Sequence, residues 1–147
     1  MKHSGTDTPS SHPAPPETLM FFAGLYGDVV DLLLDAQDYF SAQGEAYQAK
    51  ATPVERLVYS SEMSRVTLRL SSIMAWLMAR RAEHAGQITP EEAATRFRLT
   101  YSDVCTKELP EMKHVLPKYM CMLIKRSLEL YRRAERLDTM LAKQVLH

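Results

Sequence analysis

The feature that most constrains this chain is a stripe of apolar residues in its middle third. Successive members are four, three, four, three and four positions apart: Tyr59, Met63, Val66, Leu70, Ile73 and Leu77. This alternation places all of them on one side of an α-helix for about five turns. A helix with one continuous apolar stripe must bury it, so the spacing predicts a long helix inside a helical bundle.

Two start signals of the same kind frame this region. A Thr that can act as N-cap is followed by Pro and, three positions after the Thr, by Glu, at residues 52–55 and again at 89–92. This order is typical of a capping box with Pro in the first turn. The first signal opens the long helix, which runs to about Ala85 and is closed by Gly86. The second opens a short helix that ends near Leu99.

A second long helix precedes this region and runs from about Glu17 to Gln43. Its apolar residues recur at four, four, three and four positions: Leu25, Val29, Leu33, Ala36 and Phe40. Gly44 stands where a helix can end in a left-handed residue, so we expect a C-terminal cap there. Residues 45–53 then form a linker to the next helix.

A third long helix begins near Leu116 or Pro117. Its main stripe alternates by three and four positions, and a second stripe lies beside it: Met120, Leu123, Ser127, Leu130, Ala134, Leu137 and Leu141, with Ile124, Leu128 and Tyr131. An apolar face this wide needs more than one packing partner. Residues 100–112 lack such a pattern and contain Pro110, so we expect a loop with one helical turn.

These patterns predict an all-α fold, an elongated three-helix bundle with one short extra helix. We assign the bundle to residues 17–147 and treat residues 1–16, which are rich in Ser, Thr and Pro, as a disordered N-terminal tail. Three helices of this length leave part of the wide apolar face uncovered, and a second copy of the chain is the simplest cover. We therefore expect a homodimer.

No motif for catalysis or cofactor binding stands out, so we expect a protein that is not an enzyme and needs no cofactor. The five glycines are scattered singly, which excludes a Gly-rich phosphate loop. Cys105 and Cys121 have no CxxC spacing and should be reduced thiols. The sequence has neither a membrane-spanning apolar run nor a signal peptide, so we expect a cytoplasmic protein without membrane partners.

Four aspartates recur at three, four and three positions in the first helix: Asp28, Asp31, Asp35 and Asp38. They line one stripe of that helix. A bundle metal site would need Glu-x-x-His motifs on two facing helices, which this sequence does not supply. A charge stripe opposite an apolar seam is normally a solvated face, and an acidic strip that faces a protein partner is the third option. We take the four aspartates as candidate protein-interaction residues.

The net charge is zero but unevenly distributed. Residues 1–50 carry two basic and seven acidic side chains, and residues 51–147 carry sixteen and eleven. Acidic residues at positions 62, 129 and 135 interrupt the arginines and lysines of the second and last long helices and can pair with them within the same helix. A nucleic-acid-binding domain usually has a clearly basic patch and a high pI, so we do not expect nucleic acid as a partner.

Polar residues share the middle of the second long helix with its apolar stripe. Glu62, Arg65 and Arg69 flank the stripe. They could form a polar cluster inside the bundle or its dimer interface, where Arg and Glu fix the register, or they could be a solvated flank. Trp76, at the edge of the stripe, is expected to be a buried aromatic anchor rather than a ligand platform. These four residues are also candidate interaction residues.

The segment SEMSRVTLRLSSIMAWLMARRA at 61–82, followed by GQITPEEA, resembles the RcdA family, the regulators of CtrA degradation. The family pattern of Glu, Arg, Thr, Arg-Leu and Trp-Leu corresponds here to Glu62, Arg65, Thr67, Arg69, Leu70, Trp76 and Leu77. The likeness continues in the last helix with LPKY at 116–119 and RSLELYRRAERLD at 126–138. It therefore covers two of the three long helices.

This resemblance implies a dimeric three-helix bundle that works as an adaptor. Such an adaptor would engage the ClpXP protease with its priming regulator and present cell-cycle regulatory proteins, its substrates, for degradation. The alternative is a DNA-associated helical regulatory protein without enzymatic activity, which would use the basic side chains of the second and last long helices.

Overall fold

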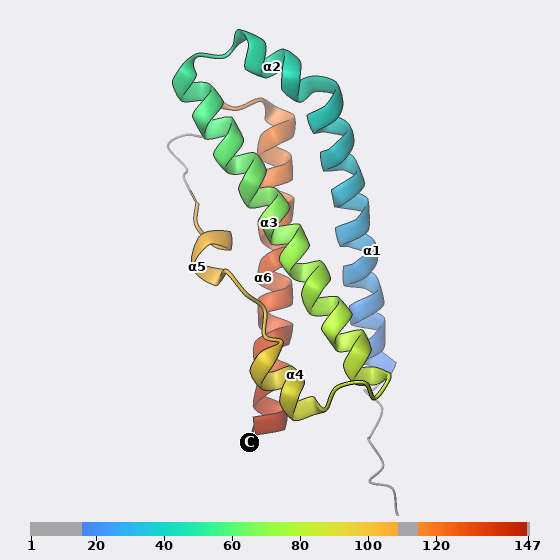
Figure 1. Ribbon diagram of the computed structural model, residues 1–147. Coiled ribbons are helices and arrows are strands. Elements are labelled where there is room, and N and C mark those ends of the chain that lie inside the picture. Colours follow the sequence, from blue (N-terminus) through green and yellow to red (C-terminus); the bar gives the residue numbers. More distant parts are fainter. Residues whose placement is uncertain (1–15, 109–114, 147) are drawn as a thin grey trace, which may run out of the picture.

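The computed structural model describes residues 16–108 and 115–146, and every regular element in these ranges is helical. The elements are α1 (Pro16–Tyr39), the π-helical turn η1 (Phe40–Gly44), α2 (Glu45–Lys50), α3 (Pro53–His84), α4 (Pro90–Arg96), α5 (Ser102–Cys105) and α6 (Lys118–Leu146). The prediction of an all-α fold is confirmed. Figure 1 shows α1, α3 and α6 side by side along much of their length. Apart from Pro16, the expected N-terminal tail lies outside the described residues.

The helix α3 begins and ends where the sequence predicts. The Thr52 hydroxyl accepts a hydrogen bond from the Glu55 backbone N–H at 3.2 Å, and the Glu55 carboxylate accepts one from the Thr52 backbone N–H at 3.4 Å. At the other end Gly86 has a φ of 75°, and its N–H donates to the carbonyl of Glu83 at 3.0 Å. Glycine adopts this left-handed conformation without a Cβ clash, so Gly86 ends the helix.

The predicted end of the first helix is wrong. Gly44 has right-handed helical angles, with φ −61° and ψ −43°, and the chain continues through η1 and α2 to Lys50. The expected linker at 45–53 is therefore mostly helical. A Cβ at Gly44 would lie 2.8 Å from the hydroxyl oxygen of Tyr59, whose side chain is fully buried. The glycine is needed here for space beside this ring, not for a left-handed turn.

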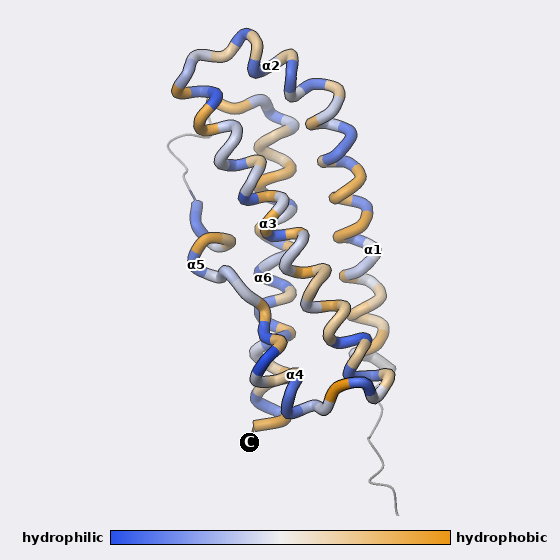
Figure 2. Tube along the Cα trace, viewed as in Figure 1, coloured by the Kyte–Doolittle hydropathy of each residue, from blue (hydrophilic) through white to orange (hydrophobic). Residues whose placement is uncertain are grey.

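The core lies between the three long helices, because α3 packs on both α1 and α6, and α1 also packs on α6. Fully buried members include Leu25, Val29, Leu32, Val66, Leu70, Ile73, Met120 and Leu123. Figure 2 shows hydrophobic and hydrophilic residues alternating along these helices. The apolar stripe of α3 packs as predicted, with Met63 at its edge. In α1, however, Leu32 and Tyr39 are buried, and the predicted Leu33 and Phe40 lie only at the border.

Residues 90–108, here named the crossing segment, run over α3 and α6 on the side away from α1 (Figure 1). The helix α4 begins as predicted, with the Thr89 hydroxyl accepting a hydrogen bond from the Glu92 N–H at 3.1 Å, but it ends at Arg96. The helix α5 is the single turn expected in the following loop. Residues 109–114, at the end of that loop, lie outside the described residues.

Candidate functional site

Arg69 lies fully inside the helical bundle, although it is a charged residue in the middle of α3. Its guanidinium donates to the carbonyl oxygens of Cys105 (2.7 Å), Lys107 (3.2 Å) and Ile124 (3.2 Å) and to the Ser127 hydroxyl (3.1 Å). Burial lowers the pKa of Arg69 from its ordinary value. Oxygen acceptors around all three nitrogens replace the lost water, so the buried cation is tolerated. Arg69 therefore ties α3 to α6 and to the crossing segment.

Glu62 and Arg65 form an ion pair on α3, close to Arg69 in the sequence. Glu62 is buried and Arg65 is half-buried. The Glu62 carboxylate raises the pKa of Arg69, which offsets part of the lowering by burial. Since an uncompensated buried cation is strongly destabilising, Glu62 supplies the balancing charge for two arginines.

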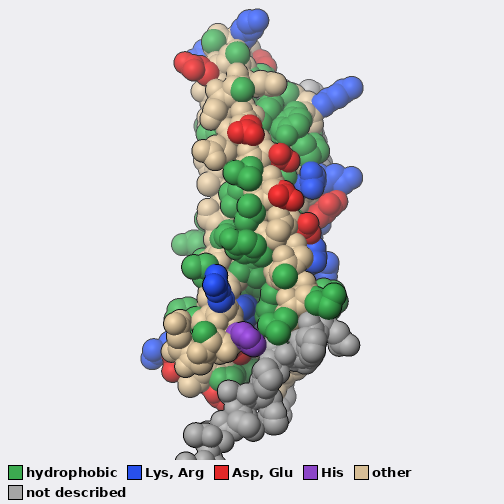
Figure 3. Space-filling view, turned by 90° about the vertical axis from the view of Figure 1, so that its right-hand side faces the viewer, with side chains coloured by type: hydrophobic (Ala, Val, Ile, Leu, Met, Phe, Trp, Pro, Cys, Tyr) green, Lys and Arg blue, Asp and Glu red, His purple; other side chains and the backbone are tan. Residues whose placement is uncertain are grey.

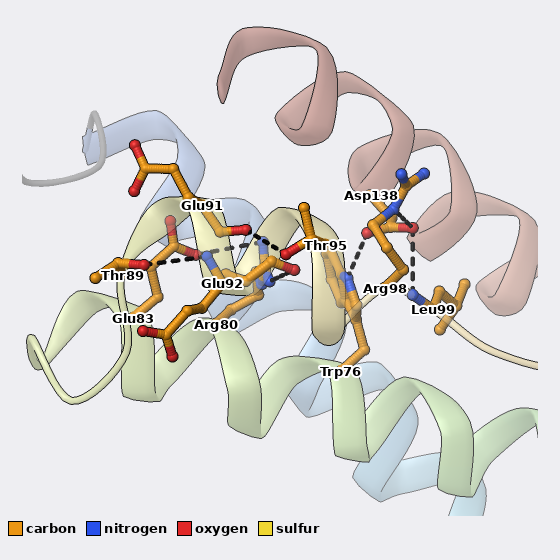
Figure 4. Close-up of polar contacts among 11 residues, drawn as sticks. Trp76, Arg80, Glu83, Thr89, Glu91, Glu92, Thr95, Arg98, Leu99 and Asp138 are labelled. Atoms are coloured by element: carbon orange, nitrogen blue, oxygen red, sulfur yellow. Dashed lines mark hydrogen bonds and ion pairs between the residues drawn. The ribbon is translucent and has the colours of Figure 1, made fainter. Parts of the chain in front are cut away.

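Asp138 on α6 is the centre of a second buried network, shown in Figure 4. Its Oδ1 accepts a hydrogen bond from the Trp76 indole N–H at 3.0 Å. Its Oδ2 accepts one from Arg98 Nε at 2.8 Å and another from the Leu99 backbone N–H at 3.2 Å. Charge-assisted bonds of this kind are stronger than neutral ones. One carboxylate, only 4% exposed, thus joins α3, α6 and the crossing segment.

Arg80 extends this network one turn beyond Trp76. It donates to the Ala93 carbonyl at 3.0 Å and pairs with Glu83 at 3.3 Å. Its guanidinium carbon lies 5.5 Å from the centre of the Trp76 ring, within cation–π distance. On α1, Phe22 packs edge-on against the same ring, with 5.7 Å between ring centres. Trp76 is therefore a buried anchor shared by several elements.

The crossing segment contains a strained residue held from both sides. Tyr101 has a φ of 65°, which is rare for a large side chain. Just before it, the Thr100 carbonyl accepts a hydrogen bond from the Tyr131 hydroxyl at 2.6 Å. Just after it, the Ser102 hydroxyl donates to the Glu135 carboxylate. These two contacts join the segment to α6 on both sides of Tyr101.

Cys105 has the chemistry of a structural thiol. The side chain is fully buried, and this burial raises the pKa of the thiol, although nearby Arg69 lowers it to a smaller extent. A raised pKa keeps Cys105 protonated at neutral pH, whereas a thiolate is needed for nucleophilic attack. The side chain of Cys105 therefore packs in the core, and its backbone carbonyl accepts a hydrogen bond from Arg69.

The four aspartates of α1 lie on the outside of the molecule. Asp28, Asp31 and Asp38 are exposed, and Asp35 is half-buried. Asp28 pairs with Arg133 of α6 at 3.0 Å, so the stripe borders the outer face of α6. Within residues 16–108 and 115–146, no three His, Cys, Asp or Glu side chains are grouped so that they could hold a metal ion. The aspartates are therefore accessible to a partner from solvent.

Large apolar side chains also remain in solvent on α1 and α3. Figure 3 shows a band of hydrophobic side chains along the long axis, with acidic side chains beside it. The large apolar side chains of α1 and α3 that are exposed, here named the exposed apolar residues, are Met20, Phe21, Tyr26, Leu34, Val54, Leu57 and Met78. None of the described helices is both long and apolar enough to cross a membrane. A band of apolar side chains on one face, such as Figure 3 shows, is typical of a binding surface.

Sequence reasoning missed Asp138 and Arg80 as members of a buried network. Asp138 follows Ala134 by four positions and Arg80 follows Leu77 by three, so both stand in the register of an apolar stripe. A charged residue in such a register must be buried with partners or lie at the edge of the stripe. A charged residue within an apolar stripe was therefore the available sign of burial, but it does not identify the hydrogen-bond partners of Asp138 and Arg80.

Comparisons with known proteins give a family and no close relative of known role. A family model described as "Protein of unknown function (DUF1465)" matches residues 18–147. No curated protein and no solved structure matches the chain. The match covers every described helix except the first residues of α1.

Proposed function

This chain belongs to the DUF1465 family, whose function is unknown, and we propose that it is a protein-binding adaptor for regulated proteolysis. It binds the ClpXP protease together with the priming regulator of that protease, and it presents cell-cycle regulatory proteins for degradation. It works in the cytoplasm and has no catalytic activity of its own.

The observation that carries this proposal is the set of exposed apolar residues. Leu34 is 54% exposed, Leu57 is 67% exposed and Met78 is 59% exposed. Each of these side chains that is removed from water on binding contributes about 1–2 kcal/mol to the binding free energy. A set of them therefore favours binding to another protein. Two of the candidate interaction residues, Arg69 and Trp76, are instead buried and hold the helices together.

The resemblance to the RcdA family supports the choice of partner. The residues that carry it in α3 include Glu62, Arg65, Arg69 and Trp76, which belong to the two buried networks. These side chains determine how the crossing segment is held on α3 and α6. Residues of this kind in common with the RcdA family favour a common architecture. The adaptor role is proposed by analogy with that family.

A dimer is part of the proposal. We expect Leu34 and Met78 to pack against a second copy, because a two-fold axis lets one apolar surface cover itself, and we expect the other exposed apolar residues to stay available to the protease and its substrates. Replacing Leu34 and Met78 together by Glu should give a monomer with an intact fold. The control variant Leu146→Glu, at a residue that is 53% exposed on α6, should remain a dimer. Sedimentation equilibrium of the three proteins decides this.

Cross-linking in native extract followed by pull-down and mass spectrometry tests the adaptor role. The proposal predicts recovery of the ClpX unfoldase and of at least one cell-cycle regulator with the wild-type chain. The Leu34→Glu, Met78→Glu double variant should recover less of both, because the adaptor we propose acts as a dimer, and Leu146→Glu should recover as much as the wild type. Absence of the unfoldase from the wild-type sample contradicts the proposal.

A further inference from the structure

The outer face of α6 carries a row of cations along most of its length. The members, here named the cationic row, are spaced seven, seven, four and seven positions apart, and all are exposed: Lys118, Lys125, Arg132, Arg136 and Lys143. With a rise of about 1.5 Å per residue, the row is roughly 37 Å long. It lies opposite the buried stripe of the same helix, so its charges face solvent.

The described part of the chain balances little of this charge. Arg132 pairs with Glu108 at 3.5 Å, but both side chains are in solvent, where such pairs contribute little. No ion pair joins the other four members to a described residue. Of the acidic residues on α6 itself, Asp138 is buried, Glu135 is half-buried and Glu129 is exposed. The row is therefore a surface with surplus positive charge.

A shallow hollow lies within the row. It is lined by Glu135, Arg136, Thr139, Met140 and Lys143. Met140 is 43% exposed and offers an apolar contact between two cations. Methionine adapts its shape to different apolar partners. The hollow therefore suits an apolar side chain that has a carboxylate on either side of it.

The row is only one helix wide, which limits what can lie on it. The acidic stripe of α1 borders it, since Asp28 reaches Arg133 at the edge of α6. Figure 3 shows acidic side chains in a column with basic side chains beyond them. Packed helices are about 8–10 Å apart, so a nucleic-acid duplex on the row would extend over α1 and bring phosphates against aspartates. A peptide helix, about 10–12 Å wide, fits on α6 without this repulsion.

We propose that the cationic row is a docking surface for an acidic, amphipathic peptide segment of another protein. Carboxylates on one face of that segment pair with the row, and an apolar side chain between them enters the hollow beside Met140. The surface is on α6, apart from the exposed apolar residues of α1 and α3. The proposal therefore does not depend on the role with ClpXP or on the dimer.

Fluorescence anisotropy with a labelled synthetic peptide tests this surface. The probe is a helical peptide with Glu at every turn of one face and Leu beside it, and its counterpart has Gln in place of Glu. The test variant carries Arg136→Glu and Lys143→Glu. The matched control carries Lys50→Glu and Arg81→Glu, which change two exposed cations on α2 and α3. Circular dichroism verifies that both variants keep the fold.

The proposal predicts that the Glu peptide binds the wild type and that the test variant loses about tenfold or more in affinity, while the control variant stays within about twofold. The Gln peptide should bind weakly to all three proteins. Equal loss in both variants overturns the proposal, and so does tighter binding of a labelled DNA duplex than of the Glu peptide. Conversion of a dimer into a monomer by the test variant alone also overturns it, because a second copy would then occupy the row.

Discussion

Trp76 on α3 and Asp138 on α6 are joined by a hydrogen bond of 3.0 Å, although 62 positions separate them in the chain. The same carboxylate receives Arg98 and the backbone of Leu99 from the crossing segment. Three donors satisfy the hydrogen-bonding capacity of this buried carboxylate. Without it, buried donors would lose their acceptor. Asp138 is therefore a point at which two long helices and a loop become interdependent.

Removal of this carboxylate should destabilise the protein. In Asp138→Ala, the indole N–H of Trp76 and the N–H of Leu99 lose their acceptor in a water-poor site. We expect a loss of about 2–3 kcal/mol in the free energy of unfolding. Glu129→Ala, at an exposed acidic residue of the same helix, should change it by less than about 0.5 kcal/mol. Urea denaturation of both variants provides the comparison, and equal midpoints would contradict the role of Asp138.

The sequence predicts local features well and long-range partners poorly. The Thr52 cap, the Gly86 terminus and the stripe of α3 are patterns within a few turns, and these match the structure. Acceptors for Arg69 lie 36 to 58 positions away in the chain, so no local pattern contains them. For that reason the sequence left open whether Arg69 is interior or solvated.

Gly44 shows why a local signal can mislead. A glycine after an apolar seam is typical of a helix end, but the same residue also permits close packing. The ring that packs on it belongs to Tyr59, which lies fifteen positions later, on the next long helix. The contact depends on how η1, which follows α1, packs against α3, and the sequence pattern of either element alone does not reveal it.

A double-mutant cycle should expose the contact between Gly44 and Tyr59. Gly44→Ala alone places a Cβ 2.8 Å from the tyrosine oxygen and should cost about 1–3 kcal/mol through overpacking. Tyr59→Phe alone should be nearly neutral, because the buried hydroxyl has no hydrogen-bond partner among the described residues. In the double variant the clash is absent, so alanine should no longer destabilise the helix.

The cycle is read from thermal or urea unfolding of the four proteins. A coupling free energy of about 1–2 kcal/mol is the expected result. If the two single effects simply add, the close approach at Gly44 has no energetic weight.

Stability should also fall at high pH because of Tyr59. Burial, with smaller contributions from Tyr39 and Tyr47, raises the pKa of Tyr59 from 10.0 to about 12. Between these values the unfolded chain has lost the proton and the folded chain still binds it, so the free energy of unfolding decreases as pH rises. Below pH 10 the contribution is fully present. Urea unfolding across this range should show a shallower decline for Tyr59→Phe than for the wild type.

Charge reversal in the acidic stripe should affect association and leave the fold intact. In Asp31→Lys with Asp35→Lys, both changes are on the outer side of α1, where Asp31 is exposed and Asp35 is half-buried. The comparison variant is Leu70→Asp, which places an unpaired charge at a fully buried position and should unfold the protein. Circular-dichroism melts of the two variants should show a cooperative transition for the double aspartate variant and none for Leu70→Asp. A collapsed melt for the aspartate variant would refute a surface role.

A reconstituted degradation assay shows whether this protein brings substrates to a protease, as we propose. Purified ClpXP, its priming regulator and a cell-cycle regulator are combined, and the disappearance of the regulator is followed with and without this protein. We expect faster degradation with the wild-type chain, and a weaker effect with the Leu34→Glu, Met78→Glu variant than with Leu146→Glu. An unchanged degradation rate at saturating wild-type protein, for every regulator recovered with it from extract, would rule out the proposed adaptor role.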